Sequence, residues 1–556
     1  MYKGLKFDPV ADMNTLRKSF MVVFKWIWMW MKCGIAVVWG ALLTVNNWRT
    51  SQGIPDRKAC KTDSEAWKSN EALRMFYLGD DADRVTVQTS THAFHVDLGR
   101  LSECSEYFRA LSQSRMREIS ESLIQLDHIP SSIFYNLLDF TFHNNFKVPR
   151  EELGAHIQVG TYLIAETFLS KCLSVLADEL TPDNCLSFLS LAQEICCPEL
   201  KMTVFTYLSR NMLEMPQIIR CLSNQELEKL VHLRKQGDKH VCSLRKENLT
   251  SWKDPETEAS RHVFSLKDSE DGGDWYPVTE LPFRADKWCF TTVVLYNYLY
   301  IIGGYRQRIK RGWEFKMSSF RYNPCTHTWV ATAPLIKFYC PQHRRHFSAV
   351  ACEGCIYAIG GWYLDSLVTP DSSTALYMAV ECYDPWDNTW RFVSSLPLTD
   401  FQFSMSLSHD VPLVTRYGRC LYVLGSIQRT GEKLLLQYNT EEDSWSELLP
   451  SLTRTDADFP ALYFLGATDK LLVIGGNNLE NVVTSYCLQT HTWGQIHRTD
   501  KDAFVGQGTV EGGQVLLMPS IKHNAVVKLD LQTLTTRTLT PLPISICYES
   551  IFCLHF

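Results

Sequence analysis

Short apolar runs that end on two glycines recur along the second half of the chain. They read YLYIIGG at residues 298 to 304, IYAIGG at 356 to 361 and KLLVIGG at 470 to 476. A continuous apolar run of about four to eight residues, stopped by turn residues, is typical of a strand buried on both faces. The pattern therefore predicts a β-rich region built from copies of one unit.

Each run opens a longer repeating unit. A loop follows the glycines, then a strand ending in Tyr, a turn of Asn, Asp, Pro or Thr, and a Trp that starts another strand, as in YNPCTHTW and YDPWDNTW. The tryptophans at 275, 329, 390, 445 and 493 recur about every 50 residues, the period of a four-stranded propeller blade. Glycine permits close backbone approach near the crowded axis and positive φ where the inner strand turns out, while Trp and Tyr fill the space between blades. The residues predicted to have these structural roles are Gly303, Gly304, Trp329, Gly360, Gly361, Trp390, Trp445, Gly475, Gly476 and Trp493.

Over residues 261 to 556 the chain resembles the kelch family, which implies an all-β propeller. Counting units gives six blades, with a degenerate unit near residues 526 to 543. Residues 261 to 278 hold the two outer strands of a blade. We expect residues 544 to 556 to supply both inner strands of that composite blade, because ring closure removes the exposed sheet edge.

The region before the propeller has a different pattern. RVTVQT and HAFHVD alternate as a hairpin from residue 84 to 97, and apolar residues then follow helical spacing, including the stretch that ends in ESLIQL at 126. SEYFRALSQSRMREI at 105 to 119 and LLDFTF at 137 to 142 resemble the BTB (POZ) family, an α+β fold. DNCLSFLSLAQ at 183 to 193 and LSNQELEKLV at 222 to 231 resemble a shortened, α-helical BACK domain. The predicted organisation is a hydrophobic N-terminal segment and linker at 1–75, a BTB domain at 76–180, a short BACK domain at 181–250 followed by a polar connector, and the propeller at 261–556.

The order BTB, BACK, kelch is that of the kelch-like proteins. This resemblance implies a non-catalytic substrate adaptor of a cullin-3 RING ubiquitin ligase and a homodimer formed through the BTB domain. His95-Val96-Asp97 stands where the family usually has Ala-His-Arg or Ala-His-Lys near its dimer seam. Carried over from the family motif, the cullin contacts fall on Phe108, Leu111, Met116, Glu118 and Phe142. The alternative is that Met116 and Phe108 are core residues and Glu118 is a solvated charge.

Basic and aromatic residues gather in the loops of two successive blades. Neighbouring blades place such loops on one face, where arginine and an aromatic anchor suit an acidic segment of a protein substrate. The alternative is an ordinary solvated loop surface. The predicted substrate face comprises Arg306, Arg308, Lys310, Arg311, Trp313, Arg344, Arg345 and Trp362.

Composition and motifs argue against other classes. A net charge of -6 does not favour a nucleic-acid partner. The 19 cysteines are mostly scattered singly, so neither a zinc site nor a disulfide framework is predicted, and a reducing, cytoplasmic location is favoured. Phosphate loops and nucleophile elbows are missing from the sequence, so no enzyme activity or cofactor is predicted. A kelch scaffold, cytoskeletal or membrane-tethered and without cullin binding, remains the second hypothesis.

Residues 20 to 45 are the most hydrophobic stretch, interrupted by Lys25 and Lys32. Three interpretations stay open: a membrane anchor or interfacial helix with tryptophans at the interface, a cleaved signal peptide, and a variable extension without a membrane role. The prediction is a cytoplasmic protein with membrane association through this segment.

Overall fold

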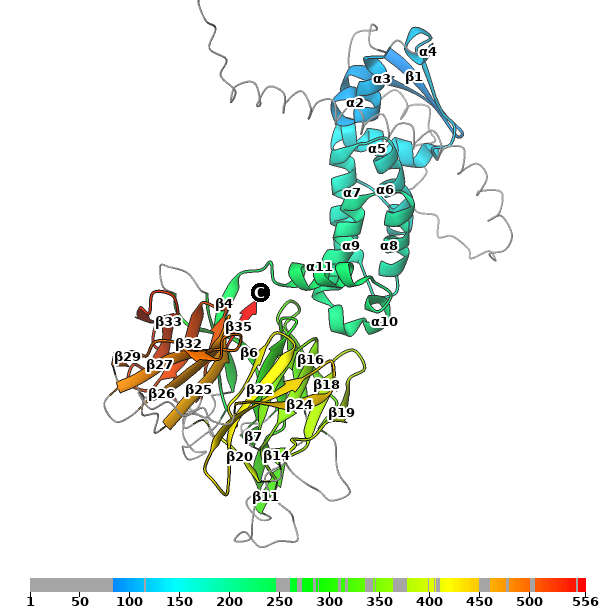
Figure 1. Cartoon of the computed structure of the whole chain (residues 1–556). Coiled ribbons are helices and arrows are strands. Elements are labelled where there is room, and N and C mark those ends of the chain that lie inside the picture. The colour runs from blue at the N-terminus through cyan, green and yellow to red at the C-terminus, as the bar shows by residue number, and fades with distance from the viewer. Residues whose placement is uncertain are drawn as a thin grey trace, which may run out of the picture. The chain divides into compact units, whose positions relative to one another are not determined.

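The computed structural model describes residues 84–556 apart from 115–116, 247–260, 268–272, 284–286, 289, 309–311, 316–318, 336–343, 346, 364–377, 399, 405, 407–410, 450–460, 477–479, 501–505 and 547–548. Contacts divide the chain into two compact units, Met1–Tyr207 and Leu208–Phe556. Figure 1 shows helices with a small sheet in the first unit and many strands in the second.

The first unit contains an α+β domain. Strand β1 (Arg84–Thr89) pairs antiparallel with β2 (Ala93–Asp97) and parallel with β3 (Leu123–Leu126), giving the order β2–β1–β3. The expected helical spacing through residue 126 is wrong at β3, because its residues alternate between greater and lesser burial, as a strand on one side of a core does. The helices are α2 (Leu98–Cys104), α3 (Glu106–Ser112), α4 (Arg117–Ser120), α5 (Ser131–His143), η4 (Arg150–Glu152), α6 (Leu153–Tyr162), α7 (Glu166–Glu179), α8 (Cys185–Glu194) and α9 (Pro198–Arg210).

Asp97 has a local role at the start of the first of these helices. Its carboxylate accepts a hydrogen bond from the backbone N–H of Arg100 at 3.1 Å, so it caps the N-terminus of α2. A basic side chain cannot accept this bond. The acidic residue at this position is therefore explained by helix capping.

The second unit begins with the end of α9 and three short helical elements. These are η5 (Met212–Glu214), α10 (Pro216–Ile219) and α11 (Asn224–Arg234). Ser223 and Glu226 form a reciprocal capping box that starts α11. The strands follow directly after α11.

After these helices, six sheets with four principal strand positions each form the main body of this unit, and two smaller sheets accompany them. From the innermost strand outward the six sheets are β8–β9–β12–β13, β15–β16–β18–β19, β20/β21–β22–β23–β24, β25–β26–β27–β28, β31–β32–β33–β34 and β35–β4–β5–β6. We number them as blades one to six. Their bounds are β8 (Thr291–Leu295), β9 (Tyr298–Ile302), β12 (Ser319–Asn323), β13 (Thr328–Thr332), β15 (Ser348–Cys352), β16 (Cys355–Ile359), β18 (Val380–Asp384), β19 (Thr389–Val393), β20 (Phe401–Phe403), β21 (Val414–Tyr417), β22 (Cys420–Ile427), β23 (Lys433–Asn439), β24 (Ser444–Leu449), β25 (Ala461–Ala467), β26 (Leu471–Gly476), β27 (Glu480–Cys487), β28 (Thr492–Trp493), β31 (Thr509–Glu511), β32 (Val515–Ser520), β33 (Ala525–Asp530), β34 (Thr536–Thr538), β35 (Glu549–His555), β4 (Lys239–Arg245), β5 (His262–Lys267) and β6 (Tyr276–Glu280).

The innermost strands follow one another around a closed ring. Strands β8, β15, β21, β25, β31 and β35 each contact the next, and β35 returns to β8. Strand β29 (His497–Asp500) adds to the outer part of blade four, and β30 (Gly506–Gln507) pairs with β35. The fold is therefore a six-bladed propeller, as the repeats predict.

The composite blade differs from the prediction in one strand. The C-terminal segment supplies the innermost strand β35, but the second strand is β4, at residues expected to lie in the helical domain and its connector. The buried ion pair between Arg245 and Glu549 (3.2 Å) joins these strands. The propeller therefore begins before residue 261.

The repeated tryptophans occupy equivalent places. Four of them each stand in register with the Tyr of the preceding strand, with ring centroids 5.0 to 5.2 Å apart, namely Trp329, Trp390, Trp445 and Trp493. Indole N–H groups then cross to the preceding blade, as Trp390 donates to the carbonyl of Ala333 at 3.0 Å and Trp445 to that of Ser394 at 2.8 Å. The Trp thus joins two blades by burial and by a hydrogen bond.

The glycine pairs are not all alike. Gly303 and Gly304 have φ of 70° and 96°, and Gly360 and Gly361 have 70° and 99°. Gly475 and Gly476 instead lie inside β26 and pair with Val482 and Asn481 of β27. The expected turn at positive φ therefore does not occur at this third pair.

Replacing Asp443 by asparagine is expected to reduce the loss of stability in acid. The hydroxyl of Tyr438 (2.6 Å) and the N–H of Ser394 (2.8 Å) donate to its carboxylate, and these bonds hold the Asp443 pKa below its usual value. A carboxyl group whose pKa is lower in the folded than in the unfolded state stabilises the fold at pH values above its unfolded-state pKa. This stabilisation is lost as the pH falls through the folded-state pKa. In blade two the neutral side-chain oxygen of Asn388 accepts the equivalent two hydrogen bonds, from the N–H of Ala333 and the hydroxyl of Tyr383. The Asp443→Asn variant should therefore change stability at neutral pH by under about 1 kcal/mol. Thermal unfolding of both proteins from about pH 3 to neutrality tests this, and equal acid slopes would contradict it.

Candidate functional site

Three of the predicted cullin contacts lie in the interior of the α+β domain. Phe108 of α3 is 0% exposed, Leu111 is 8% and Phe142 of α5 is 6%. Phe108 packs near Phe134 with ring centroids 6.4 Å apart. A partner helix cannot touch Phe108 in this conformation, so the prediction of direct contact there needs correction: the side chain belongs to the core of the domain.

Of the remaining two predicted contacts, one belongs to the short helix α4. Glu118 lies in its first turn and is partly exposed, while Met116 lies outside the described residues. Arg117 and Glu121 pair across the helix, and both are well exposed. Glu118 is therefore accessible to a partner, whereas the three buried residues are not.

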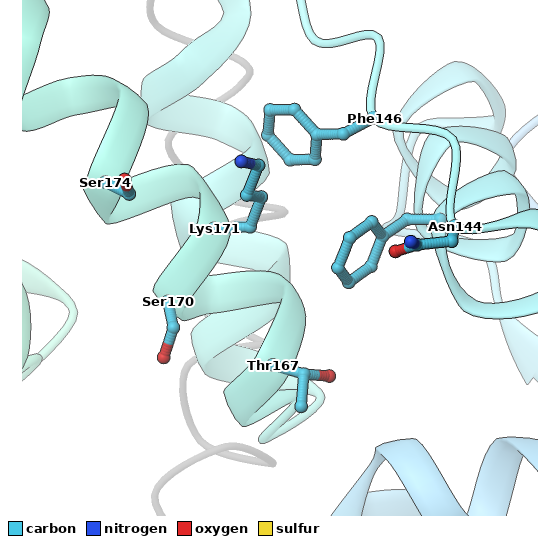
Figure 2. Close-up of a pocket in the computed structure, with 7 residues that line it drawn as sticks. Asn144, Phe146, Thr167, Ser170, Lys171 and Ser174 are labelled. Carbon is cyan, nitrogen blue, oxygen red and sulfur yellow. The ribbon is translucent and has the colours of Figure 1, made fainter.

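A groove lies between the end of α5 and one face of α7 (Figure 2). Its volume is about 480 Å³. Phe140 and Phe146 meet with ring centroids 5.8 Å apart, and the Lys171 ammonium lies 6.0 Å from the Phe146 ring. The lining is completed by Asn144, Thr167, Ser170 and Ser174.

The sequence alone does not indicate this groove. Thr167, Ser170, Lys171 and Ser174 have the i, i+3, i+4, i+7 spacing of one helix face. Such a polar stripe is the usual solvated side of an amphipathic helix, so the spacing alone does not indicate a groove. Its walls combine aromatic rings with hydrogen-bond donors, and the seven lining residues include no carboxylate.

The predicted substrate face falls on two small extra sheets of the propeller. After Gly304 the chain forms β10 (Tyr305–Arg308) and β11 (Gly312–Phe315), and β10 also pairs with β7 (Lys287–Trp288). After Gly361, β17 (Trp362–Tyr363) pairs with β14 (Arg344–Arg345). Lys310 and Arg311 lie outside the described residues.

The strand register sets two of the predicted residues opposite each other and a third opposite a lysine that was not predicted. Arg345 stands opposite Trp362, and Arg306 stands opposite Lys287. Both sheets extend from the glycine ends of the second strands in neighbouring blades one and two. They therefore lie at the same face of the ring. Strand β7 was not predicted, because Lys287 and Trp288 are not part of the repeat pattern.

Known families match both parts of this architecture. The model of the BTB/POZ domain matches residues 80–180, and that of the Kelch motif matches residues 289–336. This chain belongs to the BTB–kelch family.

Relatives of this BTB–kelch protein are distant. Kelch domain-containing protein 7A of Mus musculus is 29% identical over 49% of this chain and 30% of its own length. Kelch-like protein 23 of Homo sapiens is 23% identical over 65% of this chain and 64% of its own length. Kelch repeat and BTB domain-containing protein 13 of Homo sapiens is 26% identical, over 65% and 70%. The chain thus spans less than two thirds of the first two relatives.

One solved structure, entitled "Structure of YjhT", matches 53% of this chain and 92% of its own at 13% identity and a TM-score of 0.35. This similarity is too weak to bear on the assignment.

The prediction that this BTB–kelch protein associates with a membrane is wrong. No helix in the part of the chain that the structure describes is long and apolar enough to cross a bilayer. Residues 20 to 45, on which that prediction depended, lie outside the described residues.

The described residues also contain no group of three or more His, Cys, Asp or Glu side chains arranged to hold a metal ion.

Proposed function

We propose that this protein is a substrate-recognition adaptor of a cullin-3 RING ubiquitin ligase. The observation that carries the proposal is the presence of a BTB match and a kelch propeller on one chain. An adaptor of this kind needs no catalytic residue of its own. It holds a target beside a bound conjugating enzyme and so raises the effective concentration of one near the other.

The BTB domain would bind the cullin through the surface around α4. Met116 and Glu118 occupy the family's contact motif in the sequence, and the other three residues carried over from the family, Leu111, Phe108 and Phe142, are buried. Partial exposure of Glu118 supports this assignment. We also propose that the BTB domain forms the homodimer typical of the family, and that residues 76–180 and the helices after them form the BTB and short BACK domains.

The substrate would bind at the propeller face that carries the two extra sheets. Strand positions support this proposal: Arg306, Arg308 and Trp313 belong to strands of the first small sheet. Arg344, Arg345 and Trp362 belong to strands of the second. Lys310 and Arg311 lie in the same stretch of sequence as the first three. Arginine forms paired hydrogen bonds with carboxylates, and aromatic residues anchor apolar side chains. We therefore propose an acidic protein segment as the ligand class.

Substitution of Met116 by alanine together with Glu118 by lysine tests the cullin surface. The double variant of the full chain is expected to bind the cullin-3 N-terminal region at least about tenfold more weakly, because it removes an apolar anchor and reverses a charge. Surface plasmon resonance measures both affinities, with far-ultraviolet circular dichroism to check folding.

The matched control is Glu432→Lys, the same charge change at an exposed propeller position. It should bind like the unaltered chain. Equal binding of the double variant would reject the assignment of the surface. No binding by the unaltered chain would instead favour a kelch scaffold that works without cullin.

A further inference from the structure

The last residue of α11, Arg234, is buried against the first blade. It is 3% exposed, and every one of its guanidinium nitrogens donates hydrogen bonds within the second unit. The acceptors are the carbonyls of Tyr296 (2.8 Å, from Nε), Ser209 (2.7 Å) and Arg210 (3.0 Å, both from Nη1) and Asn297 (3.3 Å), and the side-chain oxygen of Asn323 (3.0 Å, both from Nη2). One side chain thus joins the end of α9, the β8–β9 turn and the end of β12.

Tyr298 forms a second connection at the same place. The Arg234 guanidinium lies 3.8 Å from the centre of its ring, which adds a cation–π interaction. Its hydroxyl donates to Glu214 at 2.7 Å and accepts from the N–H of Leu213 at 3.1 Å. Glu214 in turn pairs with Arg321 of β12 at 3.1 Å. Element η5 and α11 are therefore both fixed to β9 and β12.

The same contacts reach the strand that closes the ring. Asn297 donates to the carbonyl of Arg234 at 3.2 Å and to that of His555 at 2.8 Å, and it accepts from the N–H of His555 at 2.9 Å. His555 ends β35. Asn297 thus connects the helical segment to the strand that closes the ring.

We propose that Arg234 is a positioning residue that locks residues 209–234 to blade one, so that this helical segment and the propeller move as one rigid body. A buried guanidinium stays charged, and losing it leaves several carbonyls without their donor, which is costly. In the adaptor proposed above, on which this consequence depends, the lock fixes the orientation from which the propeller presents its substrate. The predicted substrate sheets extend from the glycine ends of β9 and β16, opposite the β8–β9 turn that Arg234 contacts.

Hydrogen exchange on the full chain tests the lock itself. Arg234→Met should raise amide exchange across η5 and α11 at least about tenfold, while strands β12 and β18 keep their protection. Arg234→Lys keeps the charge but has fewer hydrogen-bond donors, so its exchange rates should lie between those of the unaltered chain and those of Arg234→Met. The control is Arg220→Met, since Arg220 pairs with Asp387 of the second blade with 50% and 56% of the side chains exposed, and such a pair contributes little. Unchanged exchange in Arg234→Met, or an equal rise in Arg220→Met, would overturn the proposal.

Ubiquitin transfer separates positioning from mere stability. In a reconstituted cullin-3 complex, the Arg234→Met variant should bind the cullin with the affinity of the unaltered chain. Ubiquitin should, however, be attached to a broader set of lysines on the variant's own propeller, which mass spectrometry maps. An unchanged lysine pattern would contradict the positioning role. If the unaltered chain does not bind cullin-3, the adaptor function fails, while hydrogen exchange still decides whether the lock exists.

Discussion

A chain in which Leu554 is replaced by aspartate is expected to lose the cooperative unfolding of the propeller. Leu554 lies in β35, is 0% exposed and packs in a cluster with Val263 of blade six and Leu299 and Ile301 of blade one. An unpaired carboxylate there costs more than about 4 kcal/mol, a large part of the stability of a typical domain. Because β35 closes the ring, its loss also exposes the edge of β4 with which it pairs and removes the contact between blades six and one.

Thermal denaturation followed by tryptophan fluorescence measures this effect. The control is Ile521→Asp, which places the same charge in a turn of blade five where the native side chain is 50% exposed. It should shift stability by under about 0.5 kcal/mol. A normal transition in Leu554→Asp would show that the C-terminal strand does not close the ring.

Substitution of Gly360 by alanine is expected to destabilise the propeller by about 2 to 4 kcal/mol. Its φ is 70°, a conformation that costs an alanine free energy, and its Cβ would lie 2.6 Å from the Cγ of Pro412 and 3.2 Å from the ring of Phe403. Both neighbours belong to the next blade. The substitution therefore adds strain to the backbone and pushes blades two and three apart.

Gly418→Ala separates these two causes. Gly418 has a φ of 59°, but an alanine Cβ there would meet no atom within 4 Å beyond its chain neighbours, so its substitution carries the backbone cost alone, about 1 kcal/mol. Denaturant unfolding of both variants gives the difference. Equal losses would mean that contact between the blades contributes nothing at Gly360.

The repeats made the propeller predictable because each blade needs the same residues at the same places. Trp390 and Trp445 donate to equivalent carbonyls of the blade before them, so the spacing of tryptophan in the sequence follows the rotation of the ring. Blade five keeps its strands although Thr536 stands where the others have tryptophan. Its place in the fold is fixed by the neighbouring innermost strands β25 and β35.

Strand β4 could not be predicted in the same way. Its sequence, KHVCSLR, begins and ends with charged residues and follows a helix, which indicates a connector. Its burial depends on partners far away in sequence, since Arg245 pairs with Glu549 and His240 bonds to Ser265. Long-range pairs of this kind leave no local pattern.

The partner-binding surface of the BTB domain could not be predicted from helical spacing alone. Phe108 and Leu111 are three residues apart on α3, so they share one face. The same spacing suits a core stripe and a partner-binding stripe, and only burial separates them. In the structure both are core, which leaves Glu118 as the partly exposed member of the motif among the described residues.

Isothermal titration of the unaltered full chain with the cullin-3 N-terminal region tests the central claim most directly. We expect saturable binding with a dissociation constant of about 1 μM or tighter, at one cullin for each adaptor chain. Absence of heat and of co-migration on gel filtration at about 100 μM of each protein would contradict the adaptor function.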